Sequence, residues 1–199
     1  MTRYGPTTAL VVVDVQNDFA DPSGGLYVRG GEHVAPLVAA EVAAARAAGA
    51  LVVTTQDWHP ADTPHFVKDG GTWPVHCVGG TWGAELAPGV PEPDVRVRKG
   101  TGGEDGYSGF TVRDPVSGAE TPTALEGLLR DRGVERLVVC GIATDYCVLE
   151  TVLDGVRLGF PTTVLQDAVR AVDLEPGDGD RALRRMAGSG AALESAGQR

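Results

Sequence analysis

The stretch RLVVCGIATDYCVLE, residues 136–150, joins a short apolar strand to an amphipathic helix, and this junction decides the fold. The segment RLVVC is rich in β-branched residues, as in a buried strand, whereas residues 144–159, TDYCVLETVLDGVRLG, have apolar side chains at helical spacing. Cys147 therefore lies near the first turn of the expected helix.

The same alternation of strand and helix extends over the rest of the chain. Strands of nearly continuous β-branched residues separated by helices indicate a mostly parallel sheet covered on both faces. We therefore predict one α/β domain, residues 1–199, built as a three-layer sandwich. The expected strands are residues 9–15, 50–56, 94–100, 136–142, 162–168 and 191–195, and the expected helices are residues 34–49, 123–133, 144–159 and 180–190.

Two segments lack this periodicity. Residues 58–93 are rich in Gly, Pro and Trp, and irregular stretches of that length in compact domains are usually functional or disordered. The tryptophans argue against disorder. The glycine-rich run KGTGGEDGYSG, residues 99–109, matches neither a phosphate-binding loop nor a dinucleotide-binding fingerprint.

The composition excludes several functional classes. The 199 residues carry a formal net charge of −10, which repels phosphate backbones and anionic lipids, so we expect neither nucleic-acid nor membrane binding. No apolar run approaches membrane-spanning length, and the start MTRYGPTTAL is not typical of an export signal, so we expect a cytoplasmic protein. Three cysteines without Cys-x-x-Cys spacing indicate neither a disulfide framework nor a cysteine-rich zinc site.

Cys147 has two interpretations. An isolated cysteine usually packs as a small hydrophobic residue, and we expect this of Cys77. At a helix start, however, unpaired backbone N–H groups and the helix dipole lower the pKa of a thiol and can hold an oxyanion. Its position makes Cys147 a candidate nucleophile.

Chemically active side chains gather at one edge of the predicted sheet. Asp14 closes the first strand, Asp57 and His59 follow the second, Lys99 ends the third and Cys147 follows the fourth. Ligands of parallel α/β sheets bind beyond these carboxyl ends. Each residue could be structural by itself, but their joint placement favours a shared site. Asp14 and Lys99 would supply the base and the positive charge that a cysteine nucleophile needs.

Lysine usage singles out one position. Only Lys68 and Lys99 are lysines among 17 basic residues, and Lys99 ends the arginine-containing run VRVRK. We expect that a compact ammonium is needed there instead of a planar guanidinium, although an ordinary solvated charge would also explain the lysine.

A second group of residues could hold a metal. QDWHP places Asp57 and His59 on the same side of an extended segment, and His65 and His76 follow in the irregular stretch. Zinc or iron accepts such a mixture of imidazole and carboxylate. A single loop histidine more often bonds to backbone, but three with an aspartate favour a metal. His33 has no such company and is expected at the surface.

Six motifs occur in an order that identifies a resemblance. They are VVVDVQNDF (11–19), QDWHP (56–60), WPVHC (73–77), RKG (98–100), YSGF (107–110) and GIATDYCV (141–148). With these motifs the chain resembles the nicotinamidase (pyrazinamidase) branch of the isochorismatase-like cysteine hydrolase superfamily. The motif around Cys147 is common to the superfamily, whereas QDWHP and WPVHC resemble the nicotinamidase branch.

The resemblance implies a role for each matching residue. The catalytic triad would be Asp14, Lys99 and Cys147. The metal ligands would be Asp57, His59, His76 and, as in only some members, His65. The metal would be divalent, zinc before iron or manganese.

The resemblance also implies the surroundings of the substrate. The Ile142–Ala143 peptide would be cis, and the N–H groups of Ala143 and Cys147 would form an oxyanion hole. The remaining pocket residues would be Phe19, Trp73, Tyr107 and Tyr146.

The implied activity is hydrolysis of nicotinamide to nicotinate and ammonia through a cysteine thioester, with the metal on the pyridine nitrogen. Pyrazinamide is an expected second substrate, and the protein would act as a monomer or homodimer. Three alternatives remain. The chain could be another superfamily hydrolase acting on isochorismate or on an N-carbamoyl amide, a catalytically inactive binding protein, or a metallohydrolase in which Cys147 is only structural.

Overall fold

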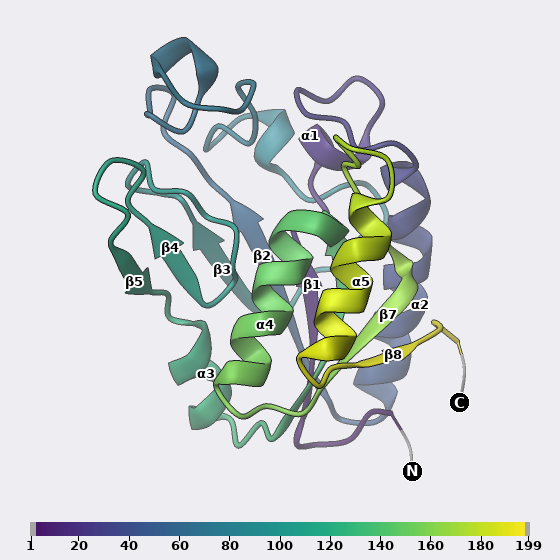
Figure 1. The fold of residues 1–199 in the computed structure, drawn as a ribbon. Coiled ribbons are helices and arrows are strands. Elements are labelled where there is room, and N and C mark those ends of the chain that lie inside the picture. Colours follow the sequence, from purple (N-terminus) through teal and green to yellow (C-terminus); the bar gives the residue numbers. More distant parts are fainter. Residues whose placement is uncertain (1–2, 198–199) are drawn as a thin grey trace.

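The computed structural model describes residues 3–197 of the chain, whose centre is a six-stranded parallel sheet (Figure 1). Each neighbouring pair of strands is parallel, as predicted. In sheet order the strands are β3 (Val95–Lys99), β2 (Leu51–Asp57), β1 (Thr8–Val13), β6 (Arg136–Ile142), β7 (Thr162–Arg170) and β8 (Ala192–Glu194).

Helices cover both faces of this sheet, which confirms the three-layer prediction (Figure 1). One face is covered by α2 (Val34–Ala47), and the other by α3 (Leu125–Asp131), α4 (Leu149–Arg157) and α5 (Asp178–Gly188). The central strand β1 is buried over its whole length, with Leu10 and Val12 in one core and Val11 and Val13 in the other. A strand between two helical layers must be apolar on both sides, so it has a continuous apolar run in sequence.

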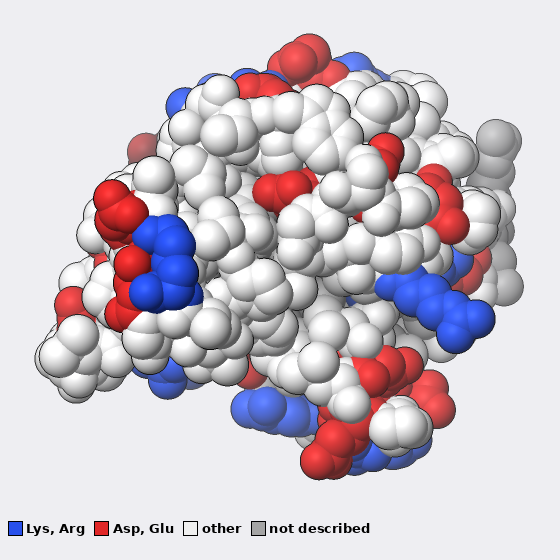
Figure 2. All heavy atoms as spheres, turned by 90° about the horizontal axis from the view of Figure 1, so that it is seen from above, with Lys and Arg blue, Asp and Glu red and all other residues white. Residues whose placement is uncertain are grey.

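The register brings the carboxyl ends of four strands to one level. Val13 pairs with Thr55 on β2 and with Gly141 on β6, and Asp57 pairs with Lys99 on β3. The loops that follow these strands therefore meet at one end of the molecule, which Figure 2 shows from above.

The structure differs from the predicted elements mainly at their ends. β1 ends at Val13, and Asp14 follows it with a left-handed φ of 48°. The helix predicted over residues 144–159 begins with a π-helical turn, Thr144–Val148, and becomes α-helical at Leu149. The last predicted helix, residues 180–190, corresponds to α5, which begins and ends two residues earlier than predicted.

Several short elements were not predicted. They are α1 (Asn17–Ala20), the antiparallel hairpin of β4 (Thr111–Arg113) and β5 (Glu120–Pro122), and the 3₁₀ turns Gly31–His33, Val67–Asp69 and Trp82–Ala84. Elements of three or four residues are too short to show a periodicity. No helix in the described part of the chain is long and apolar enough to cross a membrane.

Gly141→Ala tests the close contact of β6 with β1. Gly141 has φ 126°, and a Cβ there would lie 2.0 Å from the Val13 carbonyl oxygen, so we expect the free energy of unfolding to fall by ~2 kcal/mol or more. Gly188→Ala in α5 is the control, because a Cβ there meets nothing within 4 Å. It should leave stability unchanged or raise it by up to ~1 kcal/mol. Urea unfolding followed by circular dichroism measures both, and equal effects would contradict the account.

Candidate active site

The ammonium group of Lys99 lies at the centre of the site. Its Nζ is 2.6 Å from Asp14 Oδ2 and 2.5 Å from Asp57 Oδ1, and all three side chains are buried. Nζ donates hydrogen bonds to Asp57 Oδ1, to the Gly106 carbonyl and to Cys147 Sγ, so each of its three hydrogens has an acceptor. Asp14 follows β1, Asp57 ends β2 and Lys99 ends β3. Three adjacent strands are therefore tied together at one charge.

The charges in this cluster shift one another's pKa values. Burial alone would lower the pKa of Lys99, but Asp14 and Asp57 raise it well above its usual value. Burial opposes ionisation of Asp57 as well, but Lys99 and the nearby histidines leave its pKa lowered. At Asp14 burial has the largest effect and raises the pKa to about 6. Lys99 offsets part of the effect of burial, and repulsion from Asp57 adds to it. Asp14 is ionised at neutral pH yet basic enough to accept a proton.

Cys147 lies beside this cluster as a neutral thiol. Its Sγ is 3.8 Å from Lys99 Nζ and within 4.8 Å of carboxylate oxygens of Asp14 and Asp57. The helix start suggested a thiol with a lowered pKa, but the net shift at Cys147 is in the opposite direction. Burial raises that pKa well above its usual value, Lys99 lowers it in part, and the carboxylates of Asp14 and Asp57 raise it further. A thiolate would therefore form here only by transfer of the proton to a neighbouring base.

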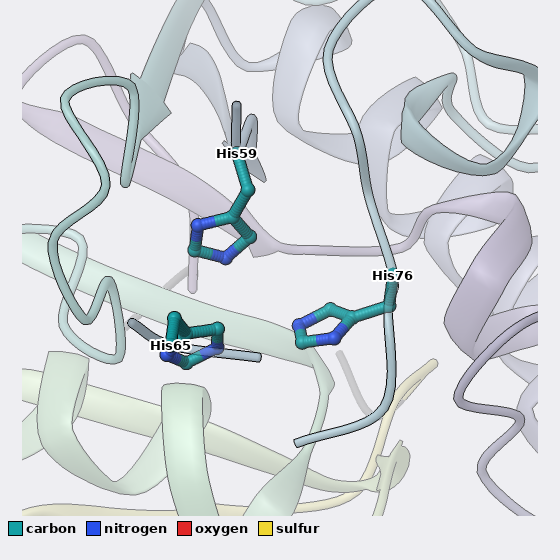
Figure 3. Close-up of side chains that lie close together, drawn as sticks. All are labelled: His59, His65 and His76. Atoms are coloured by element: carbon teal, nitrogen blue, oxygen red, sulfur yellow. The ribbon is translucent and has the colours of Figure 1, made fainter. Parts of the chain in front are cut away.

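The cluster of Lys99, Asp14, Asp57 and Cys147 is the first centre of the site. Three histidines form a second centre beside it (Figure 3). His59, His65 and His76 are buried, and one ring nitrogen of each lies within 4.8 Å of the others. The rings of His59 and His65 stack at 4.5 Å, and the ring of His76 stands edge-on, 5.3 Å from that of His59. Asp57 Oδ2 is 3.9 Å from Nε2 of both His59 and His76, while its Oδ1 binds Lys99. Asp57 therefore joins the two centres.

This donor set fits a divalent metal. Both ring nitrogens of His59 are buried without a hydrogen-bond partner, which is costly unless a ligand binds one of them. Burial lowers the pKa of His59 to about 4 and also lowers that of His76, so both rings are neutral and can donate a lone pair. Gly100 is required beside them, because a Cβ at its φ of 73° would lie 2.5 Å from the His59 ring. Zinc, iron and manganese all accept imidazole and carboxylate together.

Both centres open into one largely apolar pocket. Trp73 Nε1 donates to Tyr107 Oη at 2.8 Å, and the Trp73 ring meets the Tyr146 ring edge-on at 4.9 Å, so these aromatic walls hold each other. The pocket is lined by Phe19, Leu26, Val28, Asp57, His65, Trp73, His76, Gly106, Tyr107, Ala143, Tyr146, Cys147 and Val172.

The structure places all but one of the predicted residues at the two centres or in the pocket wall. The exception is Ile142, whose side chain packs in the core. The Ile142–Ala143 peptide is cis, as predicted. His33 is exposed and Cys77 is buried, and both predictions are confirmed.

Other residues of the site were not predicted. Leu26, Val28 and Val172 line the pocket from loops that carry no pattern in the sequence. Gln16 binds the Asp57 backbone through both side-chain ends, accepting from its N–H and donating to its carbonyl at 2.8 Å. The sequence indicated Gln16 only by its position, two residues after Asp14 at the end of an apolar strand.

Comparison with known proteins agrees with this arrangement. A family model described as the isochorismatase domain matches residues 8–198. The chain is 34% identical over 206 residues to a nicotinamidase of Escherichia coli (strain K12), a match that covers 94% of each chain.

Solved structures extend the similarity to the fold. A pyrazinamidase of Pyrococcus horikoshii, in complex with zinc, superposes with a TM-score of 0.85 at 40% identity, covering 96% of this chain and 99% of that one. PnC1 from L. infantum, in complex with nicotinate, gives a TM-score of 0.88 at 34% identity, covering 98% and 96%.

Iodoacetamide labelling tests the proton transfer from Cys147. We expect Cys147 to react before Cys77 and Cys140, because it alone of the three lines the pocket. Since its thiolate forms by transfer of the proton to Asp14, the rate should be level above about pH 6 and fall about tenfold per pH unit below it, where Asp14 is protonated. Peptide mass spectrometry of metal-free protein over a pH series measures the rate.

Glutathione, a free thiol, is the control for this experiment, because its labelling rises steadily with pH through the neutral range. Asp14→Asn should remove the level region and slow the reaction at neutral pH. A wild-type rate that parallels glutathione throughout would show that Asp14 does not take the proton.

Proposed function

Because the chain belongs to the isochorismatase family and is an amidase, we propose that it hydrolyses nicotinamide to nicotinate and ammonia, with pyrazinamide as a second substrate. One observation carries this proposal. Asp57 contacts both the cluster of Lys99 and Cys147 and the group of three histidines, and both groups line one pocket. A pyridine ring between the aromatic walls would direct its nitrogen to the histidines and its carboxamide to Cys147. Similarity to proteins solved with zinc and with nicotinate supports this orientation.

The charge of the pocket favours a neutral substrate. No Lys or Arg of the described residues lines it, and the Lys99 ammonium is already bound by two carboxylates. Figure 2 shows the same at the surface, where Lys and Arg side chains lie toward the edge of this face and not at its centre. Isochorismate and N-carbamoyl amino acids carry carboxylates, which would be buried here without a Lys or Arg side chain to pair with them. Nicotinamide and pyrazinamide are neutral.

The reaction would begin with transfer of the Cys147 thiol proton to Asp14. Lys99, 3.8 Å from Sγ, stabilises the thiolate that results. The thiolate attacks the carboxamide carbon, and the N–H groups of Ala143 and Cys147 would stabilise the oxyanion of the tetrahedral intermediate. Loss of one such donor typically costs about 100- to 1000-fold in rate.

Asp14 would complete both halves of the reaction. Its newly gained proton passes to the leaving nitrogen, so ammonia departs and a thioester to Cys147 remains. Water then attacks the thioester carbon while Asp14 takes a proton from it. The C–S bond breaks, the acid is released, and Asp14 returns the proton to Sγ to restore the thiol. A pKa of about 6 lets one carboxylate act first as base and then as acid near neutral pH.

We propose that Asp57, His59, His76 and His65 hold the metal, with zinc as the first candidate. When bound, the metal supplies a Lewis acid for the ring nitrogen, which orients the carboxamide. The four donors are buried, Asp57 is ionised and the rings of His59 and His76 are neutral, so the donors present lone pairs to a cation. All of these residues come from one chain, and we propose that one domain spanning residues 1–199 performs the reaction, as a monomer or homodimer.

Ammonia release from nicotinamide tests the proposal. Purified protein should lose activity on chelation and regain it when a divalent metal is restored. Cys147→Ala should lower kcat by roughly four orders of magnitude or more, because it removes the nucleophile. Cys140→Ala is the matched control, since Cys140 is buried in the core and does not line the pocket, and it should remain active.

Each contradictory result points to a different alternative. Folded, metal-loaded protein that releases no ammonia from nicotinamide but converts isochorismate or an N-carbamoyl amino acid would overturn the substrate. Full activity of Cys147→Ala would instead assign the chemistry to the metal centre.

A further inference from the structure

Asp105 is a buried carboxylate that the reaction above does not use. Its Oδ1 lies 2.7 Å from Nδ1 of His65, and its Oδ2 accepts a hydrogen bond from Arg113 at 2.9 Å. The backbones of Asp105 and Arg113 also exchange two hydrogen bonds, of 2.8 and 2.9 Å. Arg113 is the last residue of β4, so the β4–β5 hairpin holds Asp105 by both its backbone and its side chain.

The contact determines which ring nitrogen of His65 faces the metal centre. A carboxylate only accepts hydrogen bonds, so Nδ1 of His65 carries a hydrogen and Nε2 is the nitrogen left for a ligand. His76 is set in the same way, with its Nδ1 2.7 Å from the Pro74 carbonyl. Both rings therefore offer Nε2, the nitrogen that can share a ligand with His59.

His65 packs against four neighbouring rings, including that of His59, and its bond to Asp105 adds a directional constraint to this packing. His65 lies in the long irregular stretch, whereas His59 follows β2 directly. A second tie joins the same two segments, because Thr63 Oγ1 donates to the Gly103 carbonyl at 2.7 Å and accepts from the His65 N–H at 3.2 Å. This tie places the backbone, and the bond to Asp105 sets which nitrogen of the packed ring carries the hydrogen.

We propose that Asp105, with Arg113 behind it, is the positioning residue that makes His65 a metal ligand. This inference rests on the metal centre of the proposed function. A carboxylate behind a metal-binding imidazole fixes its tautomer and orientation, and loss of such a partner costs about 10- to 100-fold in metal affinity. The hairpin that carries Arg113 thereby contributes to the metal centre without touching it.

A double-mutant cycle on zinc affinity tests the inference. Protein freed of metal is titrated with zinc against a chromophoric chelator, for wild type, Asp105→Ala, His65→Ala and the double variant. We expect Asp105→Ala to weaken binding by about 10- to 100-fold. In the His65→Ala background the same substitution should have no further effect, because Asp105 acts through His65.

Two controls separate this role from a general loss of charge or of structure. Asp62→Ala removes an exposed carboxylate paired with Lys68 in the same loop, and it should leave zinc affinity unchanged. In Asp105→Asn, Arg113 should hold the amide oxygen and turn the NH₂ group toward His65, which imposes the wrong tautomer and weakens binding. Adding Arg113→Ala frees the amide to turn, so that double variant should recover part of the affinity.

The outcomes distinguish this inference from the proposed function. An unchanged affinity in Asp105→Ala, or an equal loss in the presence and absence of His65, would overturn the role of Asp105. If wild type binds one zinc ion per chain and His59→Ala does not, the metal centre stands in either case. A wild-type protein that binds no zinc would overturn the metal centre and this inference together.

Discussion

One buried ammonium between two buried carboxylates is the interaction on which the site depends. A charge in the interior is costly unless it is paired, and removing one partner of a buried pair typically costs about 3–5 kcal/mol. Lys99 must therefore stay bound to Asp14 and Asp57, which keeps the ends of β1, β2 and β3 at fixed separations. The compact ammonium of lysine can reach both carboxylates and the Gly106 carbonyl from one atom, which a planar guanidinium would not do.

Asp57 extends this constraint to the second centre. One of its oxygens binds Lys99 and the other faces His59 and His76, so a single carboxylate sets the distance between the Lys99 cluster and the histidines. A substrate with its two reactive ends on one small ring needs such a fixed separation. The same sharing explains why Asp14 and Asp57 differ in acidity, since Asp57 has positive or polar partners on both sides whereas Asp14 has Lys99 and Thr55.

The fold and most of the site could be predicted because their signals are local. A continuous apolar run marks β1, and the residues after each strand mark the site. The acidity of Cys147 could not be predicted, because it depends on depth of burial and on two carboxylates from other strands. Leu26 and Val172 reach the pocket from loops without a motif, and Asp105 acquires its partner only when a short unpredicted hairpin folds beside His65.

Partitioning of the acyl group between water and hydroxylamine tests the central claim, that Cys147 carries the acyl group during turnover. Hydroxylamine added to turning-over protein should intercept the thioester, so that nicotinohydroxamate forms at the expense of nicotinate. The ratio of nicotinohydroxamate to nicotinate should rise in proportion to the hydroxylamine concentration. Ammonia release should still depend on the enzyme. Nicotinate as the sole product at every concentration, together with undiminished turnover by Cys147→Ala, would contradict the account.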